Sequence, residues 1–149
     1  MISTRGRYAL RFMIDLAENS DGRCVPLRDV AARQEISPKY LEIIAKDLVA
    51  GGLITGASGK GGGYRLSRAP SQYSVGEILQ AAGEDLAPVA CLSGERNECL
   101  RRSVCRTLPM WSEYYAMVRG FFYGKKLTEL CRSSRADDTI PTGYTDAFL

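Results

Sequence analysis

The stretch PLRDVAARQEISPKYLEIIAKDLVAGGLITGASGKGGGY, from Pro26 to Tyr64, decides the fold of this chain. Its hydrophobic spacing and its turn residues predict two short helices followed by a glycine-rich hairpin. The first helix covers residues 27 to about 34, and a tight turn at 35–36 separates it from the second. Two helices joined by a short turn form a helix-turn-helix, whose second helix enters the major groove of DNA.

The second helix of this pair has strong signals at both ends. Ser37 can cap the first backbone N–H groups, a contact worth about 1 kcal/mol, and Pro38 takes the first helical position, where no N–H is needed. Gly51 and Gly52 provide the left-handed cap at the other end. Four residues at helical spacing form an apolar face: Leu41, Ile44, Ala45 and Leu48. The opposite face is mixed: Lys39, Tyr40, Glu42, Ile43 and Lys46.

The hairpin that follows has the composition of a wing. Two strand-like runs, 53–55 and 64–66, flank the loop GASGKGGG, and Lys60 lies near its tip. A glycine-dense loop can lie close to a sugar-phosphate backbone, where a lysine meets a phosphate as a point charge. An ordinary hairpin loop is the alternative. A nucleotide-binding loop is disfavoured, because neither GxGxxG nor GxxxxGK followed by Ser or Thr is present.

Two further helices frame this region. Residues 4 to about 18 have an apolar face at helical spacing, made of Ala9, Phe12, Met13 and Leu16. Ser74 and Glu77 have the spacing of a capping box, which opens a helix over residues 75–82 that Gly83 ends. We expect this helix to support the hairpin from behind.

Composition limits the classes of protein that fit. The 149 residues are 45% hydrophobic, and no apolar run approaches the roughly 18 residues of a membrane span. No signal peptide is visible, so we expect a cytoplasmic protein with no membrane partner. The absence of histidine weakens acid–base enzyme hypotheses, and we expect no enzymatic activity. Five cysteines in a reducing compartment favour metal or redox chemistry over disulfides.

The excess of positive charge is confined to the first half of the chain. Residues 1–82 hold 11 Lys and Arg against 8 Asp and Glu, whereas residues 83–149 hold 9 of each. Arg5, Arg7 and Arg11 precede the first acidic residue, Asp15. This pattern favours salt-sensitive contact with DNA phosphates, and a solvated helix end is the simpler alternative.

Residues 84–107, the cysteine loop, carry the run CLSGERNECLRRSVC. Cys91, Cys99 and Cys105 have the spacing C-x7-C-x5-C. Thiolates are the usual ligands of iron–sulfur clusters and of structural zinc, and the lack of a CxxC pair disfavours zinc. Neighbouring arginines favour the thiolate form of these cysteines. Three free thiols in a mobile loop are the alternative.

A long helix is predicted from Leu108, with Pro109 in its first turn and Gly124 at its end. Its apolar residues form a heptad-like seam: Leu108, Trp111, Tyr115, Val118 and Phe122. The same helix of a second subunit would bury this seam and create a twofold axis, with recognition helices about 34–36 Å apart or a multiple of that. Packing of the seam onto the chain's own helices is the alternative.

The motifs as a set resemble the Rrf-type family of bacterial transcription factors. They are GRYALRFMIDLAENS, ISPKYLEIIAKDLVAGGLI, GKGGGYRL, SVGEIL and the three cysteines before a long helix. The family includes iron–sulfur cluster (IscR), nitric-oxide-sensing (NsrR) and cysteine-sensing (CymR) branches, and the resemblance covers residues 1 to about 132. It implies a homodimer that binds palindromic operators. In many members three cysteines and one further ligand hold a 2Fe–2S or 4Fe–4S cluster.

The sequence departs from this family pattern at the fourth ligand. Some members have a histidine three residues after the third cysteine, where this chain has Leu108, and others have an acidic residue near position 8, where it has Tyr8. The fourth ligand therefore stays open between loop residues and an exogenous molecule. The loop candidates are Glu95, Glu98, Ser103 and Thr107. Ser58 also replaces an arginine that many members carry in the wing.

The fold class predicted is mainly α with a small β-hairpin. We expect a winged helix-turn-helix domain over 1–83, the cysteine loop as sensor over 84–107, a dimerisation helix and a short terminal helix over 108–132, and a loose tail over 133–149. The resemblance and the charges together predict these contacts with double-stranded DNA: Arg5, Arg7, Pro38, Lys39, Tyr40, Glu42, Lys60 and Arg65. A metal-free regulator responding to a metabolite or protein partner is the alternative function. An iron–sulfur electron carrier would leave the helix-turn-helix unexplained.

Overall fold

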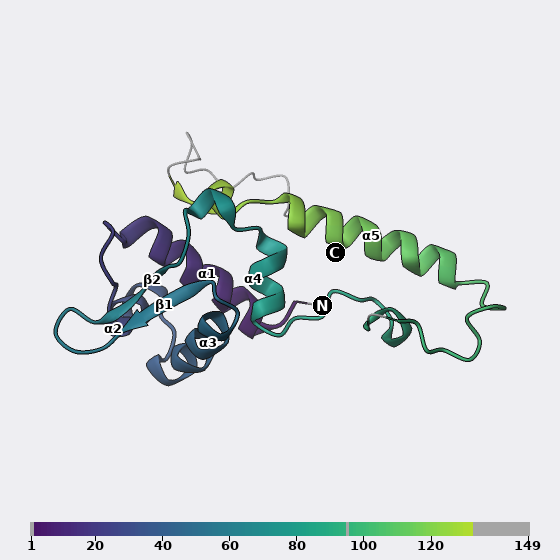
Figure 1. Cartoon of the computed structure of the whole chain (residues 1–149), viewed down its shortest axis with the longest axis horizontal. Coiled ribbons are helices and arrows are strands. Elements are labelled where there is room, and N and C mark those ends of the chain that lie inside the picture. Colours follow the sequence, from purple (N-terminus) through teal and green to yellow (C-terminus); the bar gives the residue numbers. More distant parts are fainter. Residues whose placement is uncertain (1, 95, 133–149) are drawn as a thin grey trace.

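The computed structural model describes residues 2–94 and 96–132, so the predicted tail at 133–149 and Glu95 lie outside the described residues. Within them the chain is mainly helical with one antiparallel hairpin, which confirms the predicted fold class (Figure 1). The helices and strands are α1 (Thr4–Asn19), α2 (Leu27–Gln34), α3 (Pro38–Ala50), β1 (Ile54–Ala57), β2 (Gly63–Leu66), α4 (Val75–Ala81) and α5 (Leu108–Gly124). Short 3-10 turns occupy Pro70–Gln72, Ala90–Leu92 and Leu127–Leu130.

The helix-turn-helix forms as its local signals predict. The hydroxyl of Ser37 accepts a hydrogen bond from the backbone N–H of Tyr40 at 3.2 Å, and Pro38 begins α3. Glu35 ends α2 in a left-handed conformation with a φ of 53°, which turns the chain sharply toward α3. At the far end of α3, Gly52 has a φ of 70°, a value that favours glycine.

The core lies where the apolar faces of α1, α3 and α4 meet. The faces predicted for α1 and α3 are fully buried, as is most of the face of α4. Large side chains with less than 2% exposure include Phe12, Met13, Leu16, Leu41, Ile44, Leu48, Ile78 and Leu79. Because each such burial contributes about 1.5–3 kcal/mol, this contact sets the positions of the three helices.

The hairpin differs from its predicted limits at both strands. β1 begins at Ile54 and extends to Ala57, and β2 begins at Gly63, with Ile54 opposite Leu66. Leu53 is not in the strand, because its N–H donates to the carbonyl oxygen of Leu48 at 2.9 Å and so closes the end of α3. β1 therefore starts one residue later than the sequence predicts.

The hairpin is anchored to the segment before α2. The backbones of Val25 and Tyr64 exchange two hydrogen bonds of 2.8 Å. The rings of Tyr64 and Phe12 pack edge-on, with their centroids 5.9 Å apart. A Cβ atom on Gly63 would collide with the carbonyl of Val25, so glycine is needed for this approach. The loop end of β2 is thereby fixed against α1 and the start of α2.

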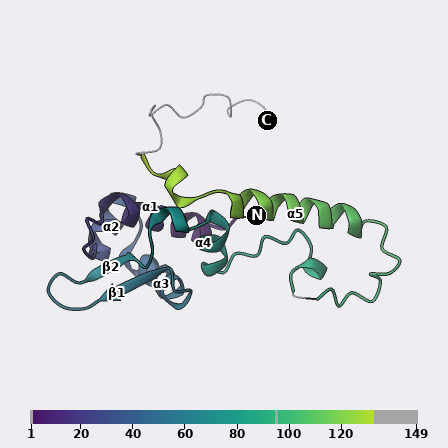
Figure 2. The same ribbon diagram turned by 45° about the horizontal axis from the view of Figure 1, so that its top comes forward.

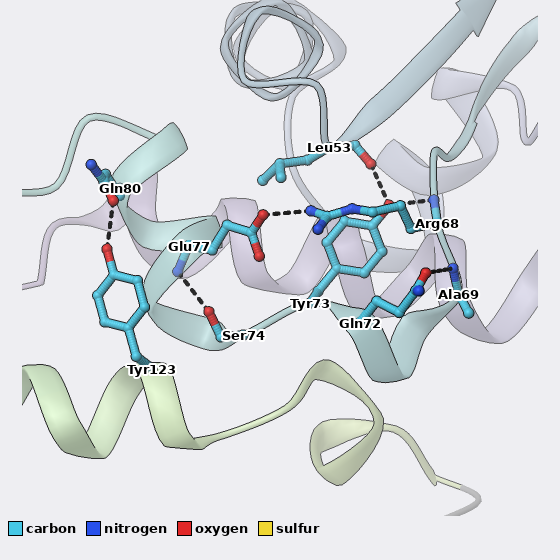
Figure 3. Close-up of polar contacts among 9 residues, drawn as sticks. All are labelled: Leu53, Arg68, Ala69, Gln72, Tyr73, Ser74, Glu77, Gln80 and Tyr123. Atoms are coloured by element: carbon cyan, nitrogen blue, oxygen red, sulfur yellow. Dashed lines mark hydrogen bonds and ion pairs between the residues drawn. The ribbon is translucent and has the colours of Figure 1, made fainter.

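The capping box predicted for α4 is only half formed. The Ser74 hydroxyl accepts from the N–H of Glu77 at 3.2 Å, but the Glu77 carboxylate forms an ion pair with Arg68 instead of turning back (Figure 3). The ion pair is available because the chain after β2 passes beside α4. Tyr73 joins the same cluster: its hydroxyl donates to the Leu53 carbonyl at 2.7 Å and accepts from the Arg68 N–H at 2.8 Å.

Helix α5 extends away from the other helices, and the cysteine loop runs out beside it and turns at its far end (Figures 1 and 2). The C-terminal end of α5 is attached to α4. The Val75 N–H donates to the Lys125 carbonyl at 2.8 Å. Figure 3 shows the second contact, in which the Tyr123 hydroxyl donates to Gln80. The short terminal helix is a 3-10 turn that buries Leu127 fully. Of the helices in the described residues, none is long and apolar enough to cross a membrane.

Replacing Tyr73 with Phe tests the cluster in Figure 3. The change removes a fully buried hydroxyl that joins the carbonyl of Leu53 to the N–H of Arg68. We expect the free energy of unfolding to fall by about 1–3 kcal/mol, because buried polar groups lose their partner. Urea unfolding measures the change. Tyr40→Phe is the matched control, because it keeps the ring contact with Tyr8, and it should stay within about 0.5 kcal/mol of the parent chain.

Candidate functional site

The predicted reading face of α3 is accessible. Pro38, Lys39 and Glu42 are exposed, and so is Ile43. Tyr40 is half-buried because its ring packs edge-on against the ring of Tyr8, with centroids 5.8 Å apart. This contact holds the Tyr40 side chain beside the N-terminal turn of α3.

An open groove of about 980 Å³ lies between α3 and the hairpin. Its walls come from the start of α2, from α3 and from the hairpin loop 56–64. Glu42 and Lys60 of the predicted contacts both line it, together with Arg28 and Lys46. A concave surface carrying three cations next to an exposed helix face suits a polyanionic duplex.

Arg28 was missed by sequence reasoning. Its side chain is 86% exposed, and its nearest acidic partner is the neighbouring Asp29 at 3.5 Å. Arg28 joins the groove because the Val25–Tyr64 pairing brings the start of α2 to the hairpin. Lys46 carried a usable signal, since its position in the helical repeat already places it on the mixed face of α3.

The other predicted cations lie elsewhere. Arg7 is exposed, with its guanidinium donating to the Thr4 hydroxyl at 3.0 Å. Arg65 is exposed and lines a separate cavity with the C-terminal part of α1. Arg5 forms an ion pair with Asp47 of α3, so its guanidinium is held against the protein.

A buried carboxylate, also missed, joins α1 to the end of α2. Asp15 is 1% exposed and accepts two hydrogen bonds from Arg33, at 2.6 and 3.0 Å, and one from the amide of Gln34 at 2.9 Å. The hydrogen bond with Asp15 raises the pKa of Arg33. Such a paired buried carboxylate orients the turn that leads into α3, and nothing in the local sequence distinguishes Asp15 from a surface residue.

The cysteine loop brings two of its three thiols to one cavity. Cys91 and Cys99 line a cavity of about 570 Å³ together with Arg96 and Glu98. Cys105 does not line it. Among residues 2–94 and 96–132, no three Cys, Asp, Glu or His side chains are gathered closely enough to hold a metal ion. The three-cysteine site is therefore not assembled in this structure.

The five thiols differ in their surroundings. The Thr107 hydroxyl lies 3.5 Å from the sulfur of Cys105, and this hydrogen bond, with backbone N–H groups and the charge of Arg101, lowers the pKa of Cys105. Burial raises the pKa of Cys131, which lies near Glu18. Cys105 is thus disposed to form a thiolate, and Cys131 is not.

Two apolar stripes run along α5. The five residues of the predicted seam (Leu108, Trp111, Tyr115, Val118 and Phe122) are all half-buried in the single chain. A second stripe beside it is 47–62% exposed: Met110, Tyr114, Met117 and Phe121. Sequence reasoning missed the second stripe, although its spacing is also heptad-like. The two stripes together form one broad apolar face.

A helix-turn-helix followed by a basic glycine-rich hairpin defines this chain as a winged-helix protein of the DNA-binding class. More particularly, the chain belongs to the Rrf2 family, whose description is iron-dependent transcriptional regulator and whose model matches residues 2–133. The predicted family is thereby confirmed, and transcriptional regulation is the function of its relatives rather than enzymatic catalysis.

Individual relatives agree with this assignment. The HTH-type transcriptional regulator IscR of Escherichia coli O1:K1 is 34% identical over 144 residues, covering 97% of this chain and 88% of its own. IscR of Cronobacter sakazakii is 32% identical over 146 residues, covering 98% of this chain and 89% of its own. Among solved structures, CymR, the global cysteine regulator of B. subtilis, matches with a TM-score of 0.74 and 27% identity over 91% of this chain and 98% of its own. T. potens IscR matches with a TM-score of 0.72 and 25% identity, covering 94% and 92%.

Thiol reactivity tests the surroundings of Cys105. Replacing Thr107 with Val removes the hydroxyl that stabilises the thiolate, so the pKa of Cys105 should rise. The pH at which iodoacetamide alkylates Cys105 at half its maximal rate should then shift upward, as measured by mass spectrometry between about pH 6 and 9. Cys91 and Cys131 serve as internal controls. An unchanged profile for Cys105 would rule out the Thr107 contact as its cause.

Proposed function

We propose that this chain is a sequence-specific regulator that binds palindromic operators as a homodimer. The groove between α3 and the hairpin is the observation that carries the proposal, because it combines an exposed helix face with three cations. Residues 38–42 would reach base edges in the major groove, and Glu42 would accept from the amino group of a cytosine. Lys60, Arg28 and Lys46 would contact phosphates around them, with Arg7 and Arg65 at the edges.

The broad apolar face of α5 supports the homodimer. Met110, Tyr114, Met117 and Phe121 are each about half exposed in the single chain, and the five seam residues lie beside them. A helix that extends away from its own domain with such a face needs a partner, and the same helix of a second copy is self-complementary (Figure 1). The twofold axis would then present two copies of α3 to two half-sites.

The sensing step is assigned to the cysteine loop. Cys91, Cys99 and Cys105 would hold a 2Fe–2S or 4Fe–4S cluster, which supplies a redox-active group that oxidants or nitric oxide can alter. The description of the family as iron-dependent supports this, as do the shared cavity of Cys91 and Cys99 and the lowered pKa of Cys105. Cluster binding would require Cys105 to approach Cys91 and Cys99. The cysteine loop would therefore become ordered when the cluster binds. The fourth ligand is unassigned.

A metal-free regulator is the second candidate. The similarity to CymR, described as a global cysteine regulator, favours a response to a metabolite or a protein partner. The separation of Cys105 from the cavity of Cys91 and Cys99 also favours it. An electron-transfer protein is not supported, because it would have no use for the groove between α3 and the hairpin. Binding to DNA would place either regulator in the cytoplasm.

Anaerobic purification distinguishes the first two candidates. We expect visible charge-transfer absorbance with stoichiometric iron and sulfide, and we expect Cys99→Ala to remove all three signals while the dimer remains, as measured by size-exclusion chromatography with light scattering. Cys24→Ala is the matched control, since Cys24 is a half-buried thiol outside the loop. A colourless chain that still binds DNA after attempted cluster reconstitution would establish the metal-free regulator instead.

The salt dependence of binding tests the groove. Lys60→Ala and Arg28→Ala should each weaken binding to duplex DNA and lower the slope of log K against log salt by about 1, because each removes one phosphate contact. Fluorescence anisotropy at several salt concentrations measures both quantities. Lys125→Ala, at the end of α5, is the control. Unchanged slopes in both groove variants would place the duplex on another surface.

A further inference from the structure

We propose that Glu84 and Arg5 are positioning residues that join the base of the cysteine loop to α3 through the first turn of α1. The proposal rests on the proposed function of the loop as a sensor. It assigns Arg5 a role other than the phosphate contact expected from its sequence position. Two sets of contacts carry it: those of Glu84 with the start of α1, including Gly6, and that of Arg5 with Asp47.

Glu84 is the first residue after the glycine that ends α4, and its carboxylate caps α1. It accepts hydrogen bonds from the N–H of Ser3 at 3.0 Å and from the N–H of Gly6 at 3.1 Å, and it contacts the Ser3 hydroxyl. The N–H of Gly6 is one of the groups that a helix start leaves without an intrahelical partner, and a negative charge is favourable there. The Ser3 hydroxyl also caps the helix locally, accepting from the N–H of Gly6 at 3.2 Å. Glu84, which lies 81 positions away in sequence from Ser3, adds a second acceptor to this cap and the negative charge that a helix start favours.

The lack of a side chain at Gly6 allows Glu84 to approach the start of α1. A Cβ atom at position 6 would lie 2.7 Å from the Cγ of Glu84, closer than two carbon atoms can approach. Glu84 is half-buried, so a side chain at position 6 would push its carboxylate away from the start of α1 toward solvent. The first turn of α1 and the base of the loop are therefore in direct van der Waals contact as well as hydrogen-bonded.

Arg5 belongs to the same turn and reaches the recognition helix. Its guanidinium forms an ion pair with the carboxylate of Asp47 in α3. The two side chains are 39% and 30% exposed, and the Nε of Arg5 is buried. Asp47 lies in the last turns of α3, where its carbonyl accepts the N–H of Gly51 at 2.8 Å. An arginine held in this way is directed at α3 rather than at the phosphates of a bound duplex.

The first turn of α1 is therefore held from two sides, by the loop through Glu84 and by α3 through Arg5. A rearrangement of the loop that withdraws Glu84 would remove this acceptor from the N–H of Ser3 and would leave the N–H of Gly6 with the Ser3 hydroxyl as its acceptor. The turn that carries Arg5 would be held less firmly. The orientation of α3 would change with it, and so would DNA affinity. Coupling of this kind is established by non-additive mutations, not by proximity.

Binding to duplex DNA distinguishes the two roles of Arg5. The probe is a duplex selected by the parent chain from a randomised pool, and affinity is measured at several salt concentrations. A positioning role predicts that Arg5→Ala and Asp47→Ala each weaken binding by a similar factor of about ten, that the double variant is no weaker than either, and that the salt slope is unchanged. Arg7→Ala, next in the same turn but exposed, should be additive with Asp47→Ala.

A phosphate-contacting Arg5 would give the opposite pattern. Arg5→Ala would lower the salt slope by about 1, and Asp47→Ala would tighten binding by removing a negative charge near the duplex. That result would overturn the proposal. Thermal unfolding of every variant checks the fold, and Arg5→Gln with Asp47→Asn replaces any variant that does not fold, with the same criteria.

Glu84→Gln tests the link to the loop. Hydrogen exchange at the Gly6 amide should accelerate in this variant, since the N–H keeps the Ser3 hydroxyl as an acceptor but loses the negative charge of its second acceptor. Alkylation of the loop cysteines should change exchange at Gly6 in the parent chain but not in Glu84→Gln. No change at Gly6 in the alkylated parent chain would overturn the coupling. If the parent chain selected no duplex at all, the proposed function itself would fail, which is a separate outcome.

Discussion

The burial of one face of α1 is the constraint on which the rest of the structure depends. Phe12, Met13 and Leu16 are fully buried, and α3, α4 and the hairpin all pack on the same helix. Because a close-packed interior allows few alternative arrangements, this face determines where α3 and the hairpin lie relative to each other. The groove between them is a consequence of that packing rather than a property of either element.

Polar contacts then refine what the apolar packing positions. Asp15 holds the end of α2 through Arg33, and Tyr73 holds the end of α3 through the carbonyl of Leu53. Both groups are buried, so their hydrogen bonds are costly to break and specify one arrangement. The helix-turn-helix is therefore fixed at two points: at Arg33 in the last turn of α2, and at Leu53 just after the end of α3. The reading face between those points is left exposed.

The cysteine loop and α5 have a different character from the winged-helix part. They lie beside it, extend from it and share few buried side chains with it (Figures 1 and 2). The end of α5 is attached through Lys125 and Tyr123, and the start of the loop is attached through Glu84. An element held at its ends and open in between can respond to a ligand or a second subunit without disturbing the core.

The sequence by itself determined what depends on neighbours along the chain. The caps at Ser37 and Ser74, the ends of α3 and α5, and the apolar faces of α1 and α3 were all predictable, because capping, glycine conformations and helical spacing act within a few residues. The family was also recognisable from the order of its motifs. Only the tertiary structure decided which side chains meet across elements. Arg28 reaches the groove, Arg5 pairs with Asp47, Glu77 leaves its capping box for Arg68, and Glu84 caps a helix 81 positions away, because these contacts depend on how α1 packs and not on any local pattern.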